Sequence, residues 1–203
     1  MQQKKLTRKQ KGELTRRQLF ESAMQLFSEK GYERVTVDDI CLAAGVSKGA
    51  FYTHFDSKDQ VVVETFLKAD DFYNEVYPEV LDEANCVERL RIFCRLVMGN
   101  ILESGVMVMR VSYYGQIAPG RVDSAIASRE RPLYQLTERL LRDGQEAGEI
   151  RSDIASSVMA EAVIHSLRGL VYDWCQQNGE FDLLEYSEVM MQLLLSGLQP
   201  ASA

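Results

Sequence analysis

Residues 36–55 read TVDDICLAAGVSKGAFYTHF, and the pattern of this stretch decides the fold. Thr36 is followed three residues later by Asp39, a pair typical of a helix start because both side chains satisfy backbone amides that lack partners in the first turn. Gly45 interrupts the helical pattern and permits a tight turn, and Ser47 can cap a second helix that extends to about His54. We therefore expect two short helices joined by a turn of a few residues.

The residues of this stretch separate into an apolar set and an outward-facing set. The apolar contact between the two helices can be formed by Ile40, Ala44, Val46 and Phe51, with the small Cys41 where the helices cross. The second helix then presents Lys48, Gly49, Ala50, Tyr52, Thr53 and His54. Donors for phosphates, combined with small residues near base edges, suit a helix that enters a DNA major groove. The alternative is a plain helical hairpin in which the same residues serve packing and solvation.

Helical spacing of apolar residues continues on both sides of this stretch, and alternating patterns typical of strands are hard to find. We expect a helix over about residues 13–30, ended by Gly31, and another over about residues 58–76, ended by Pro78. Further helices are expected at about 87–104, 122–147, 154–177 and 182–198. The predicted fold is all-α, with an arm and three-helix helix-turn-helix domain over residues 1–57 and a larger helical domain over residues 58–203.

Charge is distributed unevenly along the 203 residues, although the formal net charge is −7. Residues 1–60 hold eleven Lys and Arg against eight Asp and Glu, whereas residues 61–203 hold twelve against twenty-two. A basic N-terminal part joined to an acidic body suits a protein that meets a polyanion at one end only. No signal-peptide pattern or long apolar run is found, so we expect a cytoplasmic protein that does not enter a membrane.

A longer pattern of residues surrounds the turn. It comprises Phe27, Gly31-Tyr32, Thr36, Ile40, Ala44-Gly45-Val46-Ser47, Gly49, Phe51-Tyr52, His54-Phe55 and Ser57-Lys58. This order closely resembles the N-terminal pattern of the TetR (tetracycline repressor) family and covers about residues 14–66. The stretch GEIRSD at 148–153, before a late helix, is a weaker resemblance to the same family. The resemblance implies three DNA-binding helices, a fourth linking helix, and a larger helical domain for ligand binding and dimerisation.

The resemblance also implies which residues contact DNA. The expected set is Thr36, Ser47, Lys48, Gly49, Ala50, Tyr52, Thr53, His54 and Lys58, of which Lys48, Gly49, Ala50 and Thr53 face the bases. Thr36 and Lys58 would contact phosphates at the edges of the site, and Tyr52 and His54 would hold the DNA backbone. Tyr52 could instead be partly core, and His54 could only cap the helix end. Cys41 stands where Ala is more usual in the family, and we expect it to serve the fold.

One short recognition helix contacts few bases, so we expect a homodimer that binds an inverted-repeat operator in double-stranded DNA. The last two helices carry apolar residues at helical spacing, and the resembling family usually pairs through four such helices, two from each subunit. The expected interface residues are Val163, Leu167, Leu170, Met190 and Leu194. The same faces could instead complete the core of the monomer.

Soft and aromatic side chains in the larger domain suit a pocket for a moderately apolar small-molecule effector. The expected ligand-binding residues are Phe93, Met98, Met109, Tyr113, Tyr114 and Trp174, each of which also suits an ordinary core. A ligand that prefers a conformation with the wrong spacing between the two recognition helices must weaken DNA binding. The sequence therefore predicts a repressor released by a small ligand, with the helix at about residues 58–76 transmitting the change.

Other functional classes are less well supported by the sequence. An enzyme is not expected, because a nucleophile elbow, a phosphate-binding glycine loop and metal-ligand spacing are all missing, and we expect neither a cofactor nor a metal. The four cysteines, Cys41, Cys86, Cys94 and Cys175, are scattered and are expected to be reduced, mostly buried thiols. Two alternatives for control of DNA binding stay open, namely a protein partner and oxidation of Cys86, Cys94 or Cys175.

Overall fold

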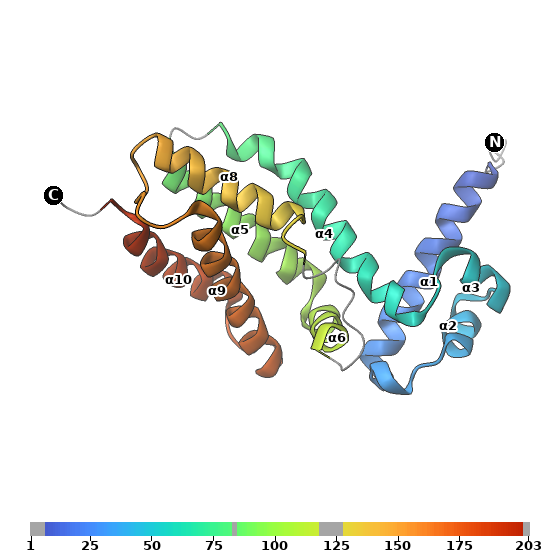
Figure 1. The fold of residues 1–203 in the computed structure, drawn as a ribbon. Helices are drawn as coiled ribbons and strands as arrows, with labels where there is room; N and C mark the ends of the chain where they lie inside the picture. Colours follow the sequence, from blue (N-terminus) through green and yellow to red (C-terminus); the bar gives the residue numbers. More distant parts are fainter. Residues whose placement is uncertain (1–6, 83–84, 118–127, 201–203) are drawn as a thin grey trace, which may run out of the picture. The chain divides into compact units, whose positions relative to one another are not determined.

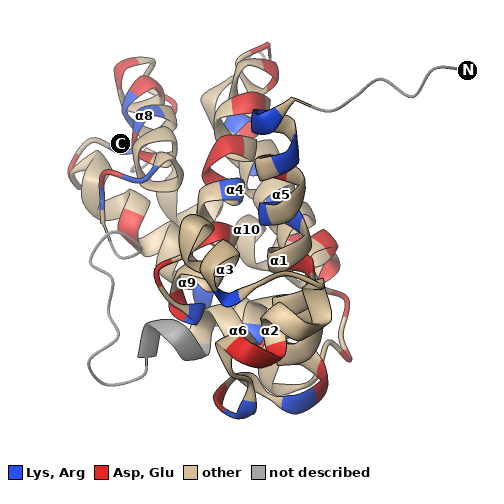
Figure 2. Cartoon of the chain, turned by 90° about the vertical axis from the view of Figure 1, so that its right-hand side faces the viewer, with Lys and Arg blue, Asp and Glu red and all other residues tan. Residues whose placement is uncertain are grey.

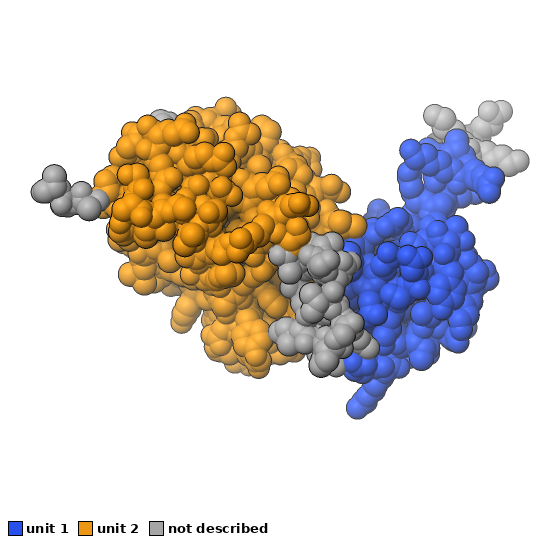
Figure 3. Space-filling model, in the orientation of Figure 1, with its two compact units in different colours: residues 1–65 blue, residues 66–203 orange. Residues whose placement is uncertain are grey.

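A computed structural model describes residues 7–82, 85–117 and 128–200, and every regular element in these ranges is helical (Figure 1). The elements are α1 (Arg8–Lys30), η1 (Tyr32–Arg34), α2 (Val37–Ala44), α3 (Lys48–His54), α4 (Lys58–Val80), α5 (Cys86–Ser104), α6 (Val106–Ile117), α8 (Pro132–Glu146), α9 (Ser156–Gln176) and α10 (Leu183–Leu198). The chain divides into two compact units, residues 1–65 and residues 66–203 (Figure 3). The division falls within α4. The all-α prediction is confirmed.

The two short helices at the turn begin and end where the sequence predicts. The helix before them is longer than expected, because α1 begins at Arg8 rather than near residue 13. Thr7 and Gln10 explain the earlier start. Their side chains form a reciprocal capping box, in which the Thr7 hydroxyl accepts from the Gln10 amide and the Gln10 side chain accepts from the Thr7 amide. Residues 8–12, which precede the expected start of the helix, are therefore part of the first helix.

The predicted end of the fourth helix at about Val76 is wrong. α4 continues to Val80 with Pro78 inside the helix. Proline removes one amide donor, and the carbonyl that would have accepted from it belongs to Asn74, which is exposed to solvent. Because Pro78 lies in the last turn, the helix has little length left to be distorted and can tolerate the residue.

The second half of the chain differs from expectation in two elements. α6 follows α5 directly after Gly105, whose φ of 82° lets the chain turn sharply, and the sequence had not singled out this helix. The expected helix over 122–147 is described only from α8 onward, which begins at Pro132 after the extended residue Arg131. Residues 122–127 of that expectation lie outside the described residues.

Each unit has its own apolar core. In unit 1, α1 contributes Leu19, Ala23 and Phe27, α2 contributes Ile40, and the following segments contribute Phe51, Phe55 and Val61. In unit 2, α5 packs against α8 and α10, and α9 packs against α8, α10 and α6. Among the described residues, no single helix has the length and hydropathy needed to cross a membrane, although α5 and α6 reach this threshold as a pair bent by 98°.

Candidate DNA-binding interface and ligand-binding core

The turn between α2 and α3 is fixed by local hydrogen bonds. Thr36 and Asp39 form the predicted capping box at the start of α2. Gly45 ends the helix at φ 67° and ψ 32°, a left-handed conformation that favours glycine, and the Val46 amide donates to the Cys41 carbonyl at 3.0 Å. α2 and α3 are therefore joined at a defined angle before any DNA is present.

α3 has one face in the core and one face in solvent. Phe51 is fully buried, and its ring lies 5.7 Å from that of Phe55, which closes the end of the helix. Tyr52 points the other way with 50% of its surface exposed, and its ring meets the edge of Phe51 at 5.4 Å. The alternative of Tyr52 as a core residue is disfavoured, because Phe51 and Phe55 already fill the inward positions.

Three of the expected DNA contacts have hydroxyls that serve the helices themselves. The Thr36 hydroxyl donates to the Asp39 carboxylate at 2.6 Å, which lowers the Asp39 pKa from its ordinary value. Ser47 accepts from the Ala50 amide at 3.2 Å and so caps α3. Thr53 donates to the Gly49 carbonyl at 2.9 Å, one turn earlier. These hydroxyls retain acceptor capacity, and the Thr53 side chain is exposed on the outer face of α3.

Lys48, at the start of α3, is held by a carboxylate that the sequence pattern does not bring into the site. Its ammonium lies 2.9 Å and 3.1 Å from the two carboxylate oxygens of Asp38 in α2, and both side chains are exposed. The hydrogen bond that Lys48 donates to Asp38 raises the Lys48 pKa from its ordinary value. Asp38 therefore occupies the donor that would approach a phosphate or a base, and it adds a negative charge to the same face.

Lys58 is engaged by its own chain rather than extended into solvent. Its ammonium donates to the carbonyls of Tyr32 at 2.9 Å and Val35 at 3.0 Å, and it lies 4.4 Å from the centre of the Tyr32 ring. The Tyr32 hydroxyl in turn donates to the Asp59 carboxylate. In this arrangement Lys58 satisfies carbonyls at the end of η1 and ties that segment to the start of α4.

The remaining expected contacts lie on the same unit. Gly49 is exposed, and Ala50 and His54 are half-buried, with the His54 ring close to Gly12 of α1. Exposed Arg8, Lys9 and Lys11 occupy the first turns of α1. Figure 2 shows blue positions in that part of the helix, next to the grey N-terminal trace. The basic character expected for the N-terminal part is therefore presented on the surface of unit 1.

The expected ligand-binding residues are largely internal to unit 2. Phe93, Met98, Met109 and Trp174 belong to one buried apolar cluster, and Tyr113 is partly buried against it. The side chain of Tyr114 lies outside the described residues. The structure thus brings together the described members of this set, in the core of the helical domain.

Polar groups are also present inside this apolar unit. Arg131 forms a two-pronged ion pair with Asp70 of α4, at 3.0 Å and 2.8 Å, and its guanidinium lies 5.2 Å from the centre of the Phe66 ring. The buried Tyr77 hydroxyl and the buried Trp174 indole N–H have no hydrogen-bond partner among the residues that the structure describes. A buried polar atom without a partner is costly, so such atoms commonly mark a place where a further group binds.

The expected dimer residues divide between core and surface. Val163 and Leu167 are buried within their own chain, whereas Leu170, Met190 and Leu194 are half-buried. Exposed large apolar side chains lie on the same two helices, namely Val158 and Tyr172 on α9 and Tyr186, Val189 and Leu193 on α10. Sequence periodicity could not divide the faces of these two helices between the core and the surface.

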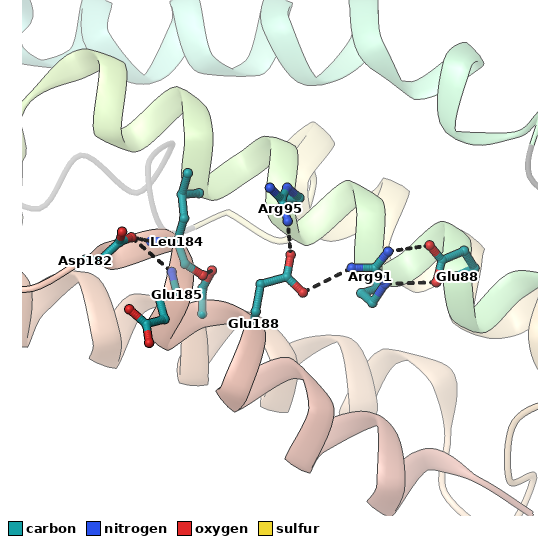
Figure 4. Close-up of polar contacts among 8 residues, drawn as sticks. Glu88, Arg91, Arg95, Asp182, Leu184, Glu185 and Glu188 are labelled. Atoms are coloured by element: carbon teal, nitrogen blue, oxygen red, sulfur yellow. Dashed lines mark hydrogen bonds and ion pairs between the residues drawn. The ribbon is translucent and has the colours of Figure 1, made fainter.

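α10 is fixed to α5 by a chain of ion pairs (Figure 4). Glu188 of α10 contacts Arg91 at 3.1 Å and Arg95 at 2.7 Å, and Arg91 also binds Glu88 through two hydrogen bonds. Asp182 caps α10 by accepting from the amides of its first turn. These contacts set the position of α10 relative to the core, so the exposed apolar residues of α10 stand on a fixed helix.

All four cysteines are buried and none forms a disulfide. Burial raises the pKa of each thiol, most strongly for Cys94, where it reaches about 12. The thiolate is the form that reacts with oxidants, and burial of the thiol suppresses it. The geometry therefore gives no support to control by cysteine oxidation. Within the described ranges, no group of histidine, cysteine or acidic residues could hold a metal ion.

Comparisons with known proteins agree with this geometry. Residues 19–65 match the family model of bacterial regulatory proteins, tetR family, and residues 83–198 match that of the tetracyclin repressor-like C-terminal domain. The chain is 27% identical over 189 residues to the HTH-type transcriptional repressor DhaR of Mycobacterium sp. (strain GP1), covering 92% of this chain and 96% of that protein.

Solved structures show the same architecture. FadR of Thermus thermophilus, a TetR family transcriptional repressor in complex with lauroyl-CoA, has a TM-score of 0.71 at 25% identity, covering 93% of this chain and 97% of that one. FadR of Bacillus subtilis, in complex with stearoyl-CoA, has a TM-score of 0.79 at 19% identity, covering 90% and 99%, and shows the shared fold. Both units thus match parts of one family: this protein belongs to the tetR family of bacterial regulatory proteins and is a DNA-binding transcriptional regulator.

Proposed function

We propose that this protein is a repressor that binds an inverted-repeat operator as a homodimer and leaves it when a small apolar effector binds in unit 2. The observation that supports this function best is α3 itself. Its inward side is locked by Phe51, while Tyr52 and Thr53 remain exposed on a helix that starts at a capped, fixed turn. Such preorganisation lets a short helix contact base edges without first having to fold.

The DNA-binding residues that we propose are those with donors or small surfaces on this face. Lys48, Gly49, Ala50 and Thr53 would approach the bases, and Tyr52 and His54 would contact phosphates. Thr36 and Ser47 would act mainly by holding α2 and α3 in place, through the caps described above. We assign Lys58 to the same positioning role, because its ammonium is already bound to two carbonyls.

The dimer would form through the outer faces of α9 and α10. These faces carry exposed Val158, Val189 and Leu193, and Leu193 has 72% of its surface exposed. Gly169 and Gly197 lie on the same helices with open space beside them, so backbones of two subunits could approach closely. Exposed apolar side chains grouped on adjacent helices are typical of a subunit interface.

We favour an effector whose apolar part is an acyl chain. The interior of unit 2 is lined by Phe93, Met98 and Met109, whose soft and aromatic surfaces suit a flexible hydrocarbon. The Thermus thermophilus relative, 25% identical over nearly its whole length, binds lauroyl-CoA. The residues that we propose to line the site are Phe93, Met98, Met109, Tyr113 and Trp174, and the proposal makes no use of Tyr114.

The first test measures binding of the full-length protein to the intergenic DNA upstream of its own gene by fluorescence anisotropy, at several salt concentrations. We expect specific, salt-sensitive binding that is lost in Tyr52→Ala and weakened less in Tyr52→Phe, which keeps the ring and removes only the phosphate donor. Leu102→Ala serves as the control, because it truncates an exposed side chain of unit 2 on α5, outside the proposed dimer faces of α9 and α10. Equal affinity of wild type and Tyr52→Ala for this DNA and for sequences selected from random DNA would contradict the proposed interface.

A further inference from the structure

Arg168 of α9 forms no ion pair with a carboxylate in the described part of the chain. It is half-buried, and its guanidinium lies 5.3 Å from the centre of the buried Tyr134 ring in α8. Within the described residues no carboxylate lies at ion-pair distance from it, whereas Arg131 of the same unit is held by both oxygens of Asp70. Asp70 therefore satisfies Arg131 structurally, whereas the Arg168 guanidinium has no carboxylate partner among the described residues.

Two tyrosine hydroxyls share the surroundings of Arg168. Tyr113 of α6 donates to the Arg168 carbonyl at 3.3 Å, near the long limit for a hydrogen bond, and its ring meets that of Tyr172 at 6.5 Å. Tyr73 of α4 is 4% exposed, and its ring packs against Phe93 at 6.2 Å. Among the described residues, the Tyr73 hydroxyl has no hydrogen-bond partner.

The electrostatic surroundings connect these groups. Burial raises the pKa of Tyr73 to about 12 and raises that of Tyr113, so both stay protonated as donors at neutral pH. The positive charge of Arg168 lowers the pKa of both hydroxyls and so opposes the effect of burial. The three groups are therefore close enough to interact electrostatically. They come from three separate helices, α4, α6 and α9.

The chemistry of this cluster selects an anion. A guanidinium is always charged and has five N–H donors, so partial burial without a partner leaves its charge and donors uncompensated. A phenol donor adds a hydrogen bond to any oxygen that the guanidinium attracts. We propose that Arg168, assisted by the Tyr73 and Tyr113 hydroxyls, binds the anionic head group of an effector whose apolar body lies among Phe93 and its neighbours. This inference rests on the proposed function and specifies the chemistry of the effector.

The positions of Tyr73 and Arg168 also indicate how a bound head group would affect α4. Tyr73 lies on α4, the helix whose first residues belong to unit 1, and Arg168 lies on α9. An anion bound by both would add a link between α4 and α9. Binding energy would then be available to favour one position of α4 over another, which is the requirement for release of DNA by a ligand.

The experiment compares three probes on the purified full-length protein by isothermal titration calorimetry. Laurate and 1-dodecanol share one hydrocarbon chain and differ in the charge of the head group, and lauroyl-CoA carries its charge on phosphates. We expect laurate or lauroyl-CoA to bind more tightly than dodecanol to the wild type, and the comparison of these two anions tells a carboxylate from a phosphate source.

Arg168→Gln is the decisive variant. We expect it to weaken binding of the preferred anion by about 10-fold to 100-fold, as expected for loss of a charged hydrogen bond, and to leave dodecanol binding unchanged. Arg168→Lys should recover part of the loss. Tyr73→Phe should weaken binding of the anion by a smaller factor. Arg142→Gln, which changes an exposed residue of α8, should not affect binding.

The outcomes separate this proposal from the proposed function. An equal loss for the anion and dodecanol in Arg168→Gln would mean a merely structural role and would overturn the proposal. Failure of the wild type to bind either anion would overturn it as well. These titrations contain no DNA, so neither result would bear on operator binding. Operator binding and its dependence on Tyr52 are tested separately by the anisotropy experiment.

Discussion

Lys58 and Thr36 illustrate how a residue with the right chemistry for DNA can be used by its own chain. The resemblance to the family pointed to both as phosphate contacts, yet Lys58 donates to two carbonyls and Thr36 caps α2. Sequence spacing places a donor at the edge of the site. It cannot reveal whether the donor binds a DNA phosphate or an acceptor of its own chain. The carbonyls of Tyr32 and Val35, which bind Lys58, come from a segment more than twenty residues earlier.

Replacing Lys58 by Met tests this assignment. We expect a loss of about 2 kcal/mol in the free energy of unfolding, because two carbonyls lose a charged donor. The dependence of operator affinity on salt should keep its slope, since the number of phosphate contacts is unchanged. Thermal unfolding and binding titrations at several salt concentrations measure the two effects, with exposed Lys9→Met as the control for stability. A reduced slope together with unchanged stability would restore Lys58 to the phosphate contacts.

Asp38 is a second residue that only the structure brings into the site. We expect Asp38→Asn to raise operator affinity by up to about fivefold, because it frees Lys48 and removes a negative charge, while an exposed ion pair stabilises the free protein by at most about 1 kcal/mol. Anisotropy titrations at low salt are the measurement. Glu103→Gln removes one negative charge in unit 2 and should leave operator affinity unchanged. If Glu103→Gln raised operator affinity as much as Asp38→Asn, the cause would be overall charge and not the release of Lys48.

At the scale of elements, the helix-turn-helix was predictable to within a residue, because caps and the turn glycine are local signals. The ends of α1 and α4 were not. The start of α1 depends on a capping box formed with Gln10, and the end of α4 depends on whether Pro78 meets a solvated carbonyl. α6 was missed because its apolar residues show little helical periodicity. Faces of α9 and α10 could not be assigned, since burial depends on neighbours distant in sequence.

Two glycines in adjacent elements should respond oppositely to the same substitution. Gly45 has a φ of 67°, so Gly45→Ala should cost about 1 kcal/mol of stability through strain. Gly49 lies inside α3, where a Cβ would meet only the Ser47 hydroxyl at 3.8 Å, so Gly49→Ala should stabilise α3 by up to about 1 kcal/mol. Thermal unfolding by circular dichroism distinguishes the two.

The same pair separates fold from function. We expect Gly49→Ala to weaken operator binding despite its greater stability, because the added methyl group stands between α3 and the base edges. Gly45→Asn should lose less stability than Gly45→Ala, since Asn tolerates the left-handed conformation. Unchanged operator affinity in Gly49→Ala would remove Gly49 from the proposed interface.

At the scale of the whole molecule, the buried acidic groups predict sensitivity to alkali. Cys94 and Tyr73 have pKa values raised to about 12, from ordinary values near 9 and 10. The unfolded chain ionises first as pH rises, so stability is full below about pH 9 and is lost progressively between about pH 9 and 12. Melting temperatures across this range measure the loss. Cys94→Ala should flatten the decline, whatever its effect at neutral pH, and an unaltered slope would contradict the assignment.

Trp174 is the single tryptophan of the chain and is 4% exposed, and no described residue accepts a hydrogen bond from its indole N–H. Its emission should therefore come from one apolar environment and be shifted towards the blue. A molecule that enters unit 2 and accepts a hydrogen bond from the indole should shift the emission towards the red. The protein thus has a built-in optical reporter, which allows effectors to be screened without a label and without knowing the operator.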